Sequence, residues 1–134
     1  MTDVKDIEGI DRIYAKKLEQ AGAGTAEALL QKGSTPQGRT DLATSTGISR
    51  KLILEWVNLV DLFRIKGVQQ EYSDLLEEAG VDTVVELALR NPARLYERMA
   101  IVNEEKNLVN KLPSENDVGN WVAQAQKLPR KVHY

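Results

Sequence analysis

Side chains that could perform covalent catalysis are scarce in this sequence of 134 residues. It contains no cysteine, and its only histidine is His133 in the terminal stretch. No serine or pair of carboxylates stands beside a base at a known motif spacing, and neither a phosphate-binding loop nor a metal-ligand pattern is present. We therefore expect a binding protein and not an enzyme, with no metal ion or other cofactor.

The residues best suited to bind an anion are Ser49, Arg50 and Lys51. Ser49 is a typical N-cap for the apolar helix expected after it, and it leaves the start of that helix uncharged. Arg50 and Lys51 place two cations in the first turn, where they oppose the helix dipole, and a bound anion would remove this penalty. The alternative is that both cations are solvated or pair with an acid such as Asp41.

A second group of cations lies near the start of the helix expected from Asp11 to about Gln20. It consists of Arg12, Lys16 and Lys17. These side chains could extend a basic strip from the first group. The alternative is a solvated polar face with no ligand.

The helix expected from Ser49 to Gly67 must position the first group of cations. Its apolar residues recur on one face, which is typical of an amphipathic helix; they are Leu52, Ile53, Trp56, Val57, Leu59, Val60 and Phe63. Leu54 and Leu62 fall among the polar positions, so they either pack against neighbouring helices or are exposed to a partner. We expect this central helix to join two halves of the protein.

An internal repeat supports the division into halves. A shift of 58 residues aligns Ile7 to Thr25 with Ile65 to Thr83. The identical pairs are Ile7/Ile65, Gly9/Gly67, Tyr14/Tyr72, Leu18/Leu76, Glu19/Glu77, Ala21/Ala79, Gly22/Gly80 and Thr25/Thr83. A shift of 65 then aligns Trp56 with Trp121 and Ser49 with Ser114. We predict a first repeat over 1–62, a second over 63–128 with an insertion near 103–111 that forms one more helical piece, and a loosely held tail over 129–134.

The matched aromatic residues have two possible roles. Trp56 and Trp121 occupy corresponding positions, and so do Tyr14 and Tyr72. We expect all four to pack in the core, and stacking on a nucleic-acid base is the alternative.

Composition indicates an all-α protein whose charge limits its partners. Hydrophobic residues make up 42% of the chain and charged residues 28%, while aromatic residues are only 5%. The net charge of −2 gives no general basic footprint for nucleic acid, so any phosphate contact must be local. The N-terminal stretch is acidic, and no apolar run approaches the roughly 20 residues that span a bilayer. We expect a cytoplasmic protein that does not bind a membrane.

The spacing of glycine and apolar residues resembles a helix-hairpin-helix motif. One copy consists of Ile7, Gly9, Ile10, Ala15 and Leu18, followed by Ala-Gly and then Thr. Its counterpart consists of Ile65, Gly67, Val68, Ser73 and Leu76, and the turn from Thr46 to Ser49 resembles a further hairpin. Nearly the whole chain is similar to an uncharacterised bacterial family of tandem helix-hairpin-helix domains, a domain of unknown function. The resemblance implies an all-α fold of two tandem helix-hairpin-helix (SAM-like) repeats that share the central helix.

The resemblance also implies sequence-independent DNA binding by the hairpin turns. In that superfamily, hairpin amides and the following helix N-terminus hold a phosphate; the turns here are Gly9-Ile10, Gly47-Ile48 and Gly67-Val68. The second glycine of many such hairpins is replaced by Asp11 in one copy and by Gln69 in the other. The carboxylate of Asp11 can occupy the same amides and repels a phosphate.

The other helix starts carry acidic neighbours as well. Glu71 and Asp74 follow Gln69, and Glu115 follows Ser114. Only Ser49 combines an uncharged cap with two cations.

Two functions from different classes therefore remain open. The first is weak, sequence-independent binding of DNA or RNA through the first repeat. The second is a scaffold for a protein partner, in which the phosphate-binding hairpins are degenerate and Leu54 and Leu62 are exposed. Salt separates the two, because electrostatic binding weakens steeply as salt rises and apolar association does not.

Overall fold

The computed structural model describes residues 2–134, and this part of the chain contains eight α-helices and no strand. After a short 3-10 helix, η1 (Val4–Asp6), these are α1 (Arg12–Gln20), α2 (Ala26–Lys32), α3 (Pro36–Thr46), α4 (Arg50–Leu62), α5 (Gln70–Glu78), α6 (Val84–Ala88), α7 (Pro92–Lys106) and α8 (Glu115–Lys127). The predicted all-α class is confirmed for these residues. No helix among residues 2–134 has the length and apolarity that crossing a bilayer requires.

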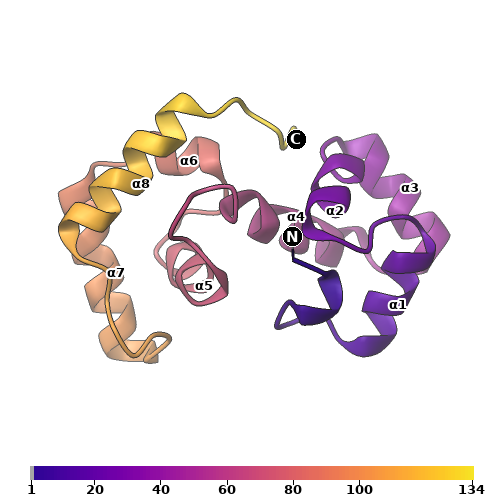
Figure 1. The fold of residues 1–134 in the computed structure, drawn as a ribbon, viewed down its shortest axis with the longest axis horizontal. Helices are drawn as coiled ribbons and strands as arrows, with labels where there is room; N and C mark the ends of the chain where they lie inside the picture. Colours follow the sequence, from indigo (N-terminus) through magenta and orange to yellow (C-terminus); the bar gives the residue numbers. More distant parts are fainter. Residues whose placement is uncertain (1) are drawn as a thin grey trace. The chain divides into compact units, whose positions relative to one another are not determined.

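The helices form two compact units. Unit 1 contains the chain up to Asp61 together with Lys131–Tyr134, and unit 2 contains Leu62–Arg130. In unit 1, α1 packs against η1 and α3, and α2 packs against α3. In unit 2, α8 lies along α6 and α7, and α5 packs against α7 (Figure 1).

Side-chain caps fix the helix starts of unit 1. The Asp11 carboxylate accepts the Tyr14 amide at 2.8 Å, Thr25 Oγ1 accepts the Ala28 amide at 3.1 Å, and Thr35 Oγ1 accepts the Gly38 amide at 3.0 Å. Such caps satisfy amide groups that have no partner within the helix. The start at Asp11 agrees with the sequence prediction.

Corresponding residues of the two units make corresponding contacts. The rings of Tyr14 and Trp56 lie 5.6 Å apart at 53°, and those of Tyr72 and Trp121 lie 5.3 Å apart at 47°. Trp56 is 5% exposed and Trp121 is 3% exposed. The prediction that both tryptophans pack in the core is confirmed, and base stacking on them is excluded because their faces are buried.

Residues 131–134 are held firmly, so the prediction of a loose tail is wrong. Val132 is buried in unit 1. The His133 amide donates to the Ser34 carbonyl at 2.7 Å, and the Tyr134 hydroxyl donates to Asn58 Oδ1 at 3.0 Å. The buried side chain of Val132 and a hydrogen bond from Arg39, described below, hold this segment in place. Its polar composition alone suggests a solvated tail.

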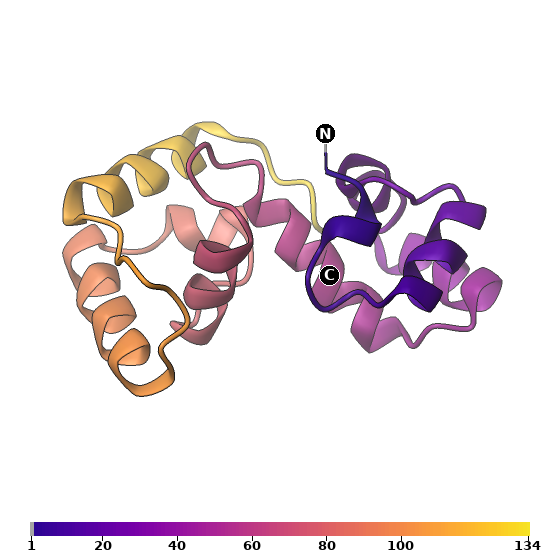
Figure 2. The same ribbon diagram turned by 60° about the horizontal axis from the view of Figure 1, so that its bottom comes forward.

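The insertion in the second repeat is not a separate helix, which corrects the sequence prediction. α7 continues to Lys106, and Asn107 ends it in the left-handed conformation at φ 51°. Residues 107–113 then run back along α7 to α8 (Figure 2). The Asn103 side chain donates to the Val109 carbonyl at 3.1 Å and accepts its amide at 2.9 Å. These two bonds and the burial of Val109 order the connection without helical structure.

The two leucines on the polar side of the central helix are not alike. Leu62 is 1% exposed and belongs to the core of unit 2, whereas Leu54 is half-buried. Packing is therefore the role of Leu62, and the alternative that it is exposed to a partner is wrong.

Candidate functional site

The hairpin before α4 is rigid and open. The Gly47 backbone is left-handed at φ 75°, and its amide donates to the Ala43 carbonyl at 2.9 Å. The Thr46 hydroxyl donates to the Leu42 carbonyl at 2.6 Å and accepts the Ile48 amide at 3.2 Å. A Cβ built on Gly47 would meet nothing within 4 Å. Hydrogen bonds to the last turn of α3 thus hold this hairpin in place, while Gly47 is exposed to solvent.

The start of α4 carries the predicted cap and two exposed cations. Ser49 Oγ accepts the Leu52 amide at 3.2 Å, as expected of an N-cap. Arg50 and Lys51 are exposed, and no acid within residues 2–134 forms an ion pair with either of them. Asp41, the acid considered in the sequence, instead accepts a hydrogen bond from Gln37 at 2.8 Å. Two solvated cations therefore remain at a positive helix end.

Arg39 of α3 is a third cation near this helix start, and the sequence analysis missed it. It is 5% exposed, and its guanidinium donates to the Gly33 carbonyl at 2.8 Å and to the His133 carbonyl at 2.7 Å. Burial lowers the pKa of Arg39, Tyr134 raises it and Arg50 lowers it. Arg50 is therefore close enough for the two cations to repel each other. No periodic pattern marks Arg39, because its neighbours on α3 are mostly polar.

The second predicted group of cations is only partly brought together. A hollow of about 720 Å³ between η1 and α1 is lined by Lys5, Asp6, Arg12, Ala15, Lys16 and Glu19. Arg12 and Lys16 share this hollow with Lys5, which the sequence analysis did not single out. Lys17 is exposed on α1 but is not among the lining residues. Two carboxylates face the same space, so its positive charge is weaker than that at the start of α4.

The hairpin before α1 is open to solvent but acidic at the following helix start. Gly9 has φ 97°, and a Cβ built there would meet nothing within 4 Å. The carboxylate of Asp11 accepts the Tyr14 amide, so it holds one of the donors that a phosphate would use. Ile10 is buried beneath the turn. This geometry agrees with the predicted obstacle to a phosphate.

The corresponding hairpin of unit 2 is in contact with α8, although Lys66 and Gly67 remain exposed. A Cβ on Gly67, at φ 96°, would lie 3.0 Å from Trp121 Nε1. The Lys66 amide donates to Gln124 Oε1 at 2.9 Å, and Gln124 Nε2 donates to the Lys66 carbonyl at 3.1 Å. Val68 is buried. The backbone N–H and C=O of Lys66 are therefore already bonded within the protein.

The two helix starts of unit 2 are no better suited to an anion. Gln69 makes no side-chain cap bond, and Glu71 stands in the first turn of α5. At α8, Ser114 and Asp117 form a capping box, with both amide-to-side-chain distances at 3.0 Å. Glu115 and Asp117 place negative charge in that first turn. An anion would meet like charge at both helix starts.

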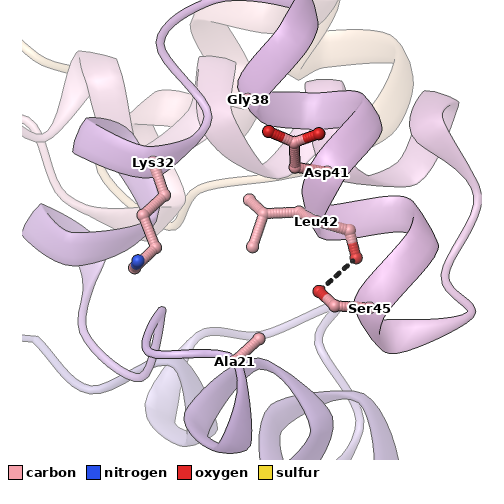
Figure 3. A pocket seen from close by; sticks show the side chains of 6 residues that line it. All are labelled: Ala21, Lys32, Gly38, Asp41, Leu42 and Ser45. Carbon is pink, nitrogen blue, oxygen red and sulfur yellow. Dashed lines mark hydrogen bonds between the residues drawn. The ribbon is translucent and has the colours of Figure 1, made fainter.

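A separate small cavity lies among α1, α2 and α3. Lys32, Asp41 and Ala21 surround a space of about 190 Å³, which Gly38, Leu42 and Ser45 also line (Figure 3). The Ser45 hydroxyl donates to the Leu42 carbonyl at 3.3 Å and Asp41 accepts from Gln37, so both groups are engaged within α3. The cavity offers a few polar contacts and no arrangement of a nucleophile with a base. In residues 2–134, no group of three or more acidic or histidine side chains is placed to hold a metal ion.

Comparison with known proteins gives a family but no function. The model of a family described as "Domain of unknown function (DUF4332)" matches residues 8–128. The search of curated proteins found no match, and neither did the search of solved structures.

Proposed function

The chain belongs to DUF4332, a family of domains of unknown function, and we propose that it is a non-enzymatic module that binds nucleic acid through unit 1. In this proposal binding is weak and independent of sequence, and duplex DNA is the ligand. The start of α4 holds a backbone phosphate between the hairpin amides and the side chains of Arg50 and Lys51. Arg12, Lys16 and Lys5 extend the contact along the strand.

The single observation that carries the proposal is the contrast among four helix starts. α1 is capped by Asp11, α5 carries Glu71 in its first turn, and α8 carries Glu115 and Asp117 in its first turn. Only at α4 does an uncharged cap meet an open hairpin and two exposed cations. The dipole of a helix start attracts a phosphate, and the nearby cations add to that attraction.

We also infer that each unit is built on a helix-hairpin-helix repeat. The support is the match of backbone and packing at corresponding residues: Gly9 and Gly67 share φ near 97°, and each unit contains a tilted tyrosine–tryptophan pair. A duplicated ancestor explains why one copy can lose a phosphate site while the other keeps one. The shared central helix is α4.

Binding of labelled duplex DNA at two salt concentrations tests the proposal. Two phosphate contacts predict that affinity falls about tenfold between roughly 50 and 200 mM salt. Single-stranded DNA and RNA of the same length should bind through the same cations with a similar salt response. Absence of binding at the lower salt, or binding that does not respond to salt, would contradict the proposal.

The second candidate, a protein-interaction scaffold, is favoured by one feature of unit 2. Leu89 is 81% exposed and Ile101 is 50% exposed, in the unit where α5 and α8 carry acidic residues in their first turns. An apolar partner surface there predicts association that survives moderate salt. Pull-down at low and moderate salt with a Leu89→Asp and Ile101→Asp variant as control distinguishes this candidate from nucleic-acid binding.

A further inference from the structure

The segment 131–134, hereafter the strap, is bound to unit 1 as an extended peptide. Its main chain is recognised from two sides, because the His133 amide donates to Ser34 and the His133 carbonyl accepts from Arg39. Val132 is 2% exposed, so the strap also fills an apolar site. The ring of Tyr134 lies 5.9 Å from the Arg39 guanidinium, while its hydroxyl is bonded to Asn58. These contacts join the strap to α3 and α4.

The guanidinium of Arg39 depends on the strap for part of its hydrogen bonding. Gly33 supplies one carbonyl acceptor and His133 supplies another. Burial disfavours the charged form of Arg39 and Arg50 repels it, whereas Tyr134 favours it. When the strap leaves, Arg39 loses the His133 carbonyl as an acceptor and the neighbouring ring of Tyr134. A cation so exposed has a strong preference for a new anionic partner.

We propose that the strap is an autoinhibitory contact: while docked it occupies Arg39, and when displaced it frees Arg39 to bind a nucleic-acid phosphate together with Arg50. This inference rests on the proposed function of unit 1. The strap and the phosphate then compete for one guanidinium. A molecule with the strap docked binds through Arg50 and Lys51 without Arg39, and release of the strap adds Arg39, so the apparent affinity rises with the fraction of molecules in which the strap is released.

The test compares the full chain with a Val132→Asp variant, which places a charge in the apolar site and undocks the strap. Lys131→Ala is the matched control, because it lowers the net charge by the same amount at an exposed position. The undocked variant should bind labelled duplex DNA at least about threefold more tightly at low salt, since a larger fraction of its molecules can use Arg39. Its affinity should fall more steeply with salt, by about 0.9 in the logarithmic slope, because one more phosphate is neutralised. Adding Arg39→Gln to the variant should remove both gains.

The outcomes separate this inference from the proposed function. If the parent binds and the Val132→Asp variant binds no more tightly with an unchanged salt slope, the strap does not inhibit, and the proposed function stands. If the parent does not bind and the variant binds, the strap is inhibitory, and the proposed function fails for the chain with its strap docked. If neither binds, the proposed function fails and the inhibition fails with it.

Folding of the variant is checked by circular dichroism, and Val132→Thr replaces Val132→Asp if the latter does not fold. Threonine has nearly the shape of valine and replaces one methyl group with a hydroxyl, so it loosens the strap with less risk to the fold than a charge does. Hydrogen exchange at the His133 amide reports docking in every variant. Rapid exchange at this amide in the parent would overturn the inference whatever the binding result.

Discussion

The two units begin with similar sequences but treat the first hairpin differently. In unit 1 a Cβ at Gly9 would meet nothing within 4 Å, whereas in unit 2 a Cβ at Gly67 would touch Trp121. The backbone N–H and C=O of Lys66, the residue before Gly67, are bonded to the side chain of Gln124. The position that corresponds to Gln124 in the first copy is Leu59, which is buried and cannot form these bonds. The last helix of unit 2 therefore engages the first hairpin of its unit, whereas a Cβ at Gly9 would have no such neighbour.

The matched tryptophans should give the largest and most similar effects in the two units. Trp56→Ala and Trp121→Ala should each lower the free energy of unfolding by about 3–5 kcal/mol, because each removes a buried ring from a tyrosine contact. Urea denaturation followed by circular dichroism measures both. A decrease of less than about 1 kcal/mol in the free energy of unfolding at either site would show that the two tryptophans are not packed equivalently.

Glycine replacement should reveal the difference between the hairpins. Gly9→Ala and Gly67→Ala both force alanine to positive φ, at a cost of about 1–2 kcal/mol in the free energy of unfolding. Gly67→Ala should cost about 1 kcal/mol more, because its new Cβ would press on Trp121 Nε1. Equal losses of melting temperature for the two variants would show that Gly67 and Trp121 are not in close contact.

The docked strap should contribute measurably to unit 1 alone. Val132→Ala removes two buried methyl groups and should lower the free energy of unfolding by about 1.5 kcal/mol. Lys131→Ala, at the exposed neighbouring position, should stay within about 0.5 kcal/mol of the parent. A silent Val132→Ala variant in urea denaturation would mean that the strap is not held by its apolar contact.

The smallest effect is expected at Gln124. Gln124→Ala should cost about 1 kcal/mol or less in stability, because the freed Lys66 peptide group lies where water can reach it. Hydrogen exchange at the Lys66 amide should nevertheless accelerate clearly, since its acceptor is gone. Unchanged exchange at the Lys66 amide would contradict the hydrogen bond assigned between this amide and Gln124.

Local features of the fold could be predicted because they depend on neighbouring residues. The caps at Asp11, Ser49 and Ser114 follow from side chains that bond the third amide along the chain. The burial of Trp56 follows from the apolar spacing around it.

Features that depend on distant residues could not be predicted. The docking of 131–134 needs Arg39, almost a hundred positions earlier, and the contacts of Lys66 and Gly67 with α8 need Gln124 and Trp121. The predicted helical piece near 103–111 was wrong because Asn103 bonds the backbone of Val109, a local alternative to helix that composition does not reveal. At the candidate site, Arg50 and Lys51 were found from their position after a cap, whereas the buried Arg39 had no sequence signal.

The most direct test of the account compares charge reversal in the two units. Arg50→Glu with Lys51→Glu should abolish binding of labelled duplex DNA at low salt. The fold should be unaffected or slightly more stable, because the new carboxylates favour the start of α4. Lys66→Glu at the hairpin of unit 2 is the control and should reduce binding only slightly. If the double variant binds DNA as the parent does, or if Lys66→Glu is equally damaging, unit 1 is not the binding surface and the central claim is wrong.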